Sequence, residues 1–202
     1  MCIRDSVFGF LVMLLVALML PYYLGRRGVL VVHPARGILG AFGVLTILNF
    51  LALAFMVLMS VTLGWVPESW PMMLGVIAAI AAAGAATYQF FLVTFGRKVG
   101  GVFAAGLFAL GVMVFGGVWP VAAIPRPLSV IHPLHPMTYA KDAFTRATDG
   151  SYDTTFWTGM GVLVVTALLT LSASQAVFRA RHLGTARIVD EHLFRVKDTA
   201  VA

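Results

Sequence analysis

Long apolar runs without a single charged residue most constrain what this chain can fold into. A helix that crosses the hydrocarbon layer of a membrane needs about 20 such residues. Only helices and closed barrels satisfy their backbone in lipid, and these runs are too long for the tilted strands of a barrel. The sequence therefore predicts an all-α fold, a polytopic membrane helix bundle. Five transmembrane helices are expected, over about 7–24, 38–63, 72–95, 102–119 and 155–178.

The overall composition supports this class. The chain is 60% hydrophobic and 11% charged, whereas soluble domains average about 25% charged residues. The net charge of +6 is explained by basic residues at the cytoplasmic ends of membrane helices, so the expected partner is the lipid bilayer and not a nucleic acid. A single cysteine, Cys2, excludes an intramolecular disulfide and a cysteine-based zinc site.

The orientation in the membrane follows from the basic residues. They gather in alternate connections, which lie on one side if every span crosses once; that side is expected to be cytoplasmic. These residues are Arg26, Arg27, Arg36, Arg97, Lys98, Arg179, Arg181 and Arg187. Tryptophan prefers the membrane interface, and Trp65, Trp70, Trp119 and Trp157 all fall at the opposite ends of their spans. We expect a multi-pass membrane protein whose start lies outside and whose tail, 179–202, is cytoplasmic.

The first residues, "MCIRDS", have no basic n-region and so resemble neither a signal peptide nor an anchor for an outside start. They resemble a translated adapter remnant. We therefore expect residues 1–6 to be a non-native or truncated start, with further native sequence preceding Val7, and we assign no function to Cys2.

The outer loop, 120–154, is predicted to be a broken, partly re-entrant segment followed by a short amphipathic outer helix. Its prolines prevent one continuous helix, and Thr138 is the predicted N-cap with "DG" at 149–150 as the stop. His132 and His135 could share a metal. Each precedes a proline, which disfavours helical backbone there, so structural histidines are the favoured interpretation and no metal site is expected.

Polar residues within the predicted spans are few, namely Thr46, Asn49, Thr87, Tyr88 and Gln89. They could line a polar path between the second and third spans, but hydrogen bonding between helices is their more common role. No charged residue lies deep in a span, which disfavours an ion-coupled transporter. The P-loop, G-x-S-x-G and H-E-x-x-H motifs are missing. We expect no enzyme activity and no cofactor, and any ATP must be bound by another chain.

The stretch 114–150 resembles the closing outer loop of ABC-2-type membrane proteins, most closely the C-terminal domain of the YhgE/Pip (phage infection protein) family. That family's loop has a Gly-Gly-x-aromatic-Pro start, a second proline, a Pro-x-x-Pro-Met-Thr-Tyr core, and then an arginine and a glycine. The matching positions here are Gly116, Gly117, Trp119, Pro120, Pro125, Pro133, Pro136, Met137, Thr138, Tyr139, Arg146 and Gly150.

The resemblance implies the membrane block of an ABC-2 permease-like protein that supports export or cell-surface assembly, with ATP supplied by a separate ATPase subunit if it is used. It also implies a homodimer, and a cytoplasmic coupling loop that contains Arg26, Arg27 and Arg36. The alternative is a membrane scaffold or surface receptor that transports nothing and serves phage or secretion-system surface proteins.

Overall fold

Every element in the described part of the chain is a helix. The computed structural model describes residues 34–111 and 135–200. The helices are α2 (Pro34–Thr62), α3 (Trp70–Phe95), α4 (Arg97–Leu110), α6 (Pro136–Asp149) and α7 (Thr154–Ala200). Segments of three of them are long and apolar enough to cross a membrane: Ile38–Thr62, Trp70–Phe95 and Thr154–Arg181.

These three segments match three of the five predicted spans, and the all-α prediction is confirmed for the described residues. The predicted fourth span is described only as far as the shorter apolar helix Lys98–Leu110. The predicted first span, 7–24, and residues 112–119 lie outside the described residues.

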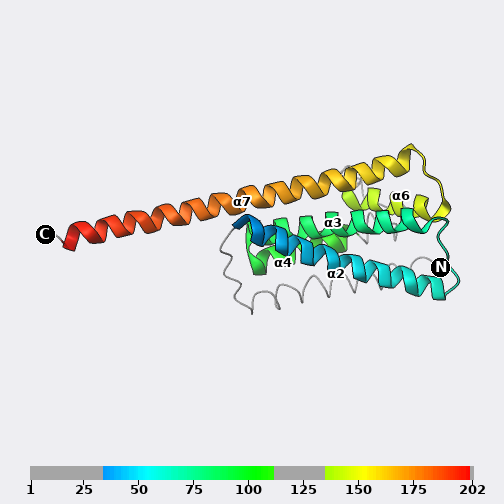
Figure 1. Ribbon diagram of the computed structural model, residues 1–202, viewed down its shortest axis with the longest axis horizontal. Coiled ribbons are helices and arrows are strands. Elements are labelled where there is room, and N and C mark those ends of the chain that lie inside the picture. Colours follow the sequence, from blue (N-terminus) through cyan, green and yellow to red (C-terminus); the bar gives the residue numbers. More distant parts are fainter. Residues whose placement is uncertain (1–33, 112–134, 201–202) are drawn as a thin grey trace.

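Helices α3 and α7 run parallel to each other and α2 runs antiparallel to both, so the bundle has two distinct ends (Figure 1). The end with the α2–α3 and α6–α7 turns, called here the tryptophan end, carries Trp65, Trp70 and Trp157. The other, the arginine end, carries the α3–α4 turn and Arg181. At this turn Gly96 has φ 79°, a backbone conformation that side chains with a Cβ rarely adopt. The chain can therefore reverse within one residue between α3 and α4.

Helix α3 lies at the centre of the bundle and contacts all four other described helices. Its buried face is rich in small residues, among them Ala81, Ala83, Ala85 and Ala86. Lipid tails are as apolar as leucine, so membrane helices associate through close van der Waals packing, which small residues permit. A run of alanines therefore explains why α3 takes the central position.

The outward faces of the long helices are apolar. Ile47 on α2 and Leu169 on α7 are 60% and 65% exposed. Exposed apolar stripes of this length would be a liability in water, whereas in a membrane they face lipid.

Helix α7 differs from its prediction at the C-terminal end. A span over 155–178 was expected, followed by a tail, but the helix continues unbroken for 47 residues to Ala200. Residues 179–200 contain no proline that would remove a backbone donor and end the helix. The last part of α7 therefore extends well beyond the other described helices (Figure 1).

Candidate functional site

Helix α6 is the described element with the most unusual position. It starts beside the middle of the bundle and runs to the tryptophan end, packed lengthwise against α3 and α7 (Figure 1). Ala140 is buried together with Ala83 near the middle of α3 and Leu163 of α7, and Met137 packs against the same cluster. With 14 residues, at about 1.5 Å each, α6 reaches only half as far as its neighbours. The predicted short amphipathic helix is therefore present as α6, and it lies alongside the half of α3 that is nearer the tryptophan end.

The start of α6 is fixed by a histidine and a proline. Pro136 is the first helical residue, and the His135 side chain accepts a hydrogen bond from the Met137 backbone N–H at 3.2 Å. Proline suits this position because its missing N–H would have no partner in the first turn anyway. The prediction of Thr138 as N-cap was wrong, since Thr138 lies inside the helix. The prediction of a structural role for His135 is confirmed, because its ring caps the helix and is 8% exposed.

His135 also joins α6 to α4. A Cβ built on Gly111, which follows the last residue of α4, would lie 2.7 Å from the Cε1 atom of the imidazole and 3.5 Å from the Met137 Cβ. Distances below 3.0 Å are tighter than real Cβ atoms show, so only glycine lets the ring approach so closely. The start of α6 is therefore wedged against α4 at mid-length of the bundle.

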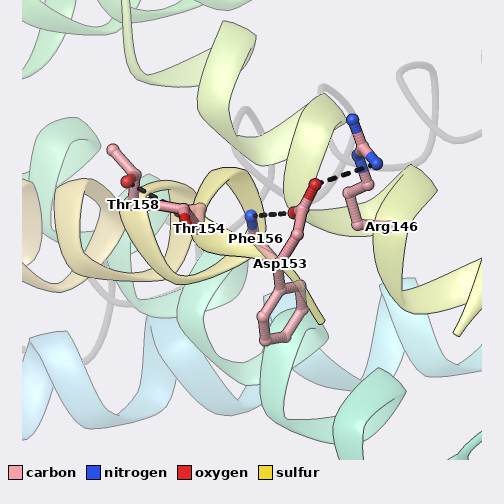
Figure 2. A network of polar contacts seen from close by, with 5 residues as sticks. All are labelled: Arg146, Asp153, Thr154, Phe156 and Thr158. Atoms are coloured by element: carbon pink, nitrogen blue, oxygen red, sulfur yellow. Dashed lines mark hydrogen bonds and ion pairs between the residues drawn. The ribbon is translucent and has the colours of Figure 1, made fainter. Parts of the chain in front are cut away.

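The other end of α6 is locked to the start of α7 by polar contacts (Figure 2). Gly150, with φ 68°, ends the helix, and its N–H donates to the Arg146 carbonyl, so the predicted stop at 149–150 is confirmed. The Arg146 guanidinium forms an ion pair with the Asp153 carboxylate at 3.0 Å. The second oxygen of Asp153 accepts from the Phe156 N–H at 3.0 Å, as an N-cap residue does.

The α2–α3 turn covers this end of α6. The Trp65 ring stacks on the Phe144 ring with centroids 6.2 Å apart and planes 5° from parallel. The Glu68 side chain lies across Gly150, where a built Cβ would come within 2.6 Å of its Cγ. Phe156, 1% exposed, fills the space beneath together with Met73. At the tryptophan end, the α2–α3 turn, the end of α6 and the start of α7 are therefore packed against one another.

The two faces of α6 differ in chemistry. Ala140, Ala143 and Ala147 are buried against α3 and α7, and Ala143 meets Gly159 of α7, whose built Cβ would lie 3.2 Å away. The opposite face is polar, and its exposed members are Lys141, Thr145 and Asp149, with Asp142 half-buried beside them.

Two of the polar residues predicted within the spans make structural hydrogen bonds. The Gln89 side-chain amide donates to the Ile38 carbonyl of α2 at 2.9 Å, and the Thr87 hydroxyl donates to the Ala83 carbonyl of its own helix at 2.8 Å. Tyr88 is buried among Leu45, Ala85 and Ala104. For Gln89 and Thr87 these contacts match the ordinary structural role of polar groups in membrane helices.

At the arginine end, the Arg181 guanidinium donates to the Thr94 carbonyl at 2.5 Å. Thr94 lies in the last turn of α3, whose carbonyls have no partner within the helix and carry the negative end of the helix dipole. Sequence reasoning counted Arg181 only as a marker of orientation, because its partner on α3 is distant in the chain.

The predicted motif residues are only partly brought together. Pro136, Met137, Thr138, Tyr139, Arg146 and Gly150 all belong to α6 and its C-terminal turn. Gly116, Gly117, Trp119, Pro120, Pro125, His132 and Pro133 lie outside the described residues, as do Arg26 and Arg27 of the predicted coupling loop. Arg36 lies in the first turn of α2. Among the residues that the structure describes, no group of three His, Cys, Asp or Glu side chains could hold a metal ion.

The described residues form an all-helical arrangement with three candidate membrane spans and a short helix, α6, packed against two of them. Comparisons with protein-family models, with curated proteins and with solved structures find no match for this chain.

Proposed function

We propose that this chain is the membrane-spanning part of an exporter of the ABC-2 permease type, driven by a separate ATPase subunit. The observation that carries the proposal is α6, which starts beside the middle of α3 and α7 and runs to the tryptophan end. A pure anchor has no need of a discontinuous helix, whereas transporters use helices that end near the midplane of the membrane to build their pathway. The sequence resemblance of 114–150 to ABC-2-type outer loops supports the same class.

The distribution of charge supports a cytoplasmic arginine end. Through residue 181, the described acidic side chains are Glu68, Asp142, Asp149 and Asp153, all on the tryptophan-end turns or on α6. Lys98, Arg179 and Arg181 are exposed at the opposite end. Positive charge collects on the cytoplasmic side of membrane proteins, so the ATPase would dock at the arginine end and the tryptophan end would face outward.

The proposal is tested by purifying the tagged chain from cells that also express candidate ATPase subunits. We expect one ATPase to co-purify and its rate of ATP hydrolysis to rise when both are placed in nanodiscs. Lys98→Glu should weaken this coupling, because it reverses an exposed charge at the arginine end, whereas Lys141→Glu, a matched change on α6, should leave docking intact. If no candidate ATPase binds or responds, the exporter assignment is wrong.

A membrane scaffold or surface receptor is the second candidate, and the packed surface at the tryptophan end favours it. The Trp65–Phe144 stack and the Arg146–Asp153 ion pair join three segments into one outward surface that a partner could recognise. A scaffold predicts binding of a surface protein that is lost in Trp65→Ala while no ATPase is stimulated.

A further inference from the structure

We infer that the polar face of α6 lines a water-filled vestibule that opens at the tryptophan end and reaches the interior of the membrane. The inference rests on the proposed function and deepens it, because such a vestibule would admit a hydrophilic solute. It starts from the juxtaposition of a polar helix face, which carries Lys141, Asp142 and Thr145, with the middle of two membrane-spanning helices.

The depth of α6 follows from its neighbours. The hydrocarbon layer is about 30 Å thick, or about 20 helical residues. Twenty residues back from Arg179, at the arginine end of α7, the chain reaches Gly159. Twenty residues back from Phe95, at the same end of α3, it reaches Gly75. Both positions lie next to the tryptophans of the other end, where an aromatic belt is expected. Both helices therefore place the membrane boundary near the tryptophans, at levels that differ by about 6 Å.

The first half of α6 lies below this boundary. Ala140 packs against Leu163 and Ala83, which are one turn (about 6 Å) below Gly159 and two turns (about 12 Å) below Gly75. The next residues, Lys141 and Asp142, are therefore roughly 3–10 Å inside the hydrocarbon thickness. Neither is in an ion pair within the described part of the chain.

Contact with lipid tails would be unfavourable for the polar face of α6. A lysine can extend its charged amine toward the interface, but the short side chain of Asp142 cannot. Ionisable residues at membrane depth face the interior of a bundle or a water-filled cavity and mark solute pathways. The opposite, alanine-rich face of α6 occupies the contact with α3 and α7, so the polar face points away from them, and water satisfies its charges best.

Single cysteines test this in a Cys2→Ser background, in sealed proteoliposomes treated with a membrane-impermeant, charged thiol reagent. Only a hydrated cysteine forms the reactive thiolate. Lys141→Cys and Asp142→Cys should be labelled from the tryptophan side. Val165→Cys is the matched control, because it is 53% exposed, close in depth to Leu163 and on an apolar face. We expect labelling at least about tenfold faster on α6 than at position 165, since burial in hydrocarbon suppresses the thiolate.

Each other outcome overturns the inference. Equal, slow labelling at 141, 142 and 165 means that lipid or protein covers the face, and disulfide-linked dimers of Lys141→Cys would identify that cover as a second copy. Equal, fast labelling means that this level lies outside the membrane. Asp142→Cys changes little in size, so a poorly folded Lys141→Cys would not prevent the test. Labelling without ATPase stimulation would reject the exporter assignment alone, whereas stimulation without labelling would reject the vestibule alone.

Discussion

The contact between α6 and α7 is expected to depend on Gly159. A Cβ at this position would lie 3.0 Å from the Tyr139 carbonyl oxygen and 3.2 Å from the Ala143 Cβ. One of these neighbours is backbone, so α6 as a whole must shift to make room. Inserting a carbon into such a packed contact typically costs about 1–3 kcal/mol of stability. We therefore expect Gly159→Ala to be less stable by this amount than a glycine-to-alanine change whose new methyl group contacts no other residue.

Gly161 provides that matched substitution. It lies on the same helix two positions further on, and a Cβ there has no neighbour within 4 Å. Replacing glycine by alanine within a helix changes the backbone propensity by about 1 kcal/mol, and this term is common to both variants. The difference between Gly159→Ala and Gly161→Ala therefore isolates the packing term.

Thermal unfolding in detergent, followed by tryptophan fluorescence, measures the difference. For a chain of this size, 1 kcal/mol corresponds to about 2–4 °C in Tm, so Gly159→Ala should unfold about 2–12 °C below Gly161→Ala. Ala143→Gly removes one of the two close contacts and should recover part of the loss in the double variant, since neighbouring sites couple. Equal Tm values for the two glycine variants would refute the position of α6 across Gly159.

Three further substitutions test individual contacts by the same unfolding measurement. Asp153→Ala removes the N-cap of α7 and should lower the free energy of unfolding by about 1 kcal/mol. Asp153→Asn keeps the cap and should lose only the partly exposed ion pair, about 0–1 kcal/mol. Equal losses in the two variants would contradict the capping role. His135→Ala should lower the free energy of unfolding by about 0.5–2 kcal/mol. His135→Asn should lower it much less, because asparagine can still accept the hydrogen bond from the Met137 N–H. Equal values for the two variants would mean that the cap is unimportant. Gln89→Leu should cost about 0.6 kcal/mol, the average for a hydrogen bond between membrane helices, and a neutral result would show that the bond to the Ile38 carbonyl adds nothing.

The start of α6 shows what local sequence could have revealed. The residue before a proline avoids helical backbone, and that rule was used to argue against a helix through the histidines. The same rule places His135 just outside a helix that begins at Pro136, which is where an N-cap residue belongs. Histidine is not among the favoured N-cap residues, which is why the sequence alone predicts Thr138 at this position.

The charge of α6 shows what local sequence could not reveal. Lys141 and Asp142 lie in a segment that hydropathy assigns to an outer loop, so the sequence predicts no charge at membrane depth. Their depth depends on Ala140 meeting Ala83 and Leu163, residues that are far away in the chain. No hydropathy window contains both partners of such a contact.

The sequence by itself determined that this is a helical membrane protein, and it located three spans to within a few residues of Ile38–Thr62, Trp70–Phe95 and the start of α7. Each residue in a span must individually tolerate lipid, so the signal is local and additive along the chain. Only the tertiary structure decided which helix is central and how deep α6 reaches. Those features depend on the fit of small residues between helices, such as Ala143 against Gly159, and that fit exists only once distant segments are packed together.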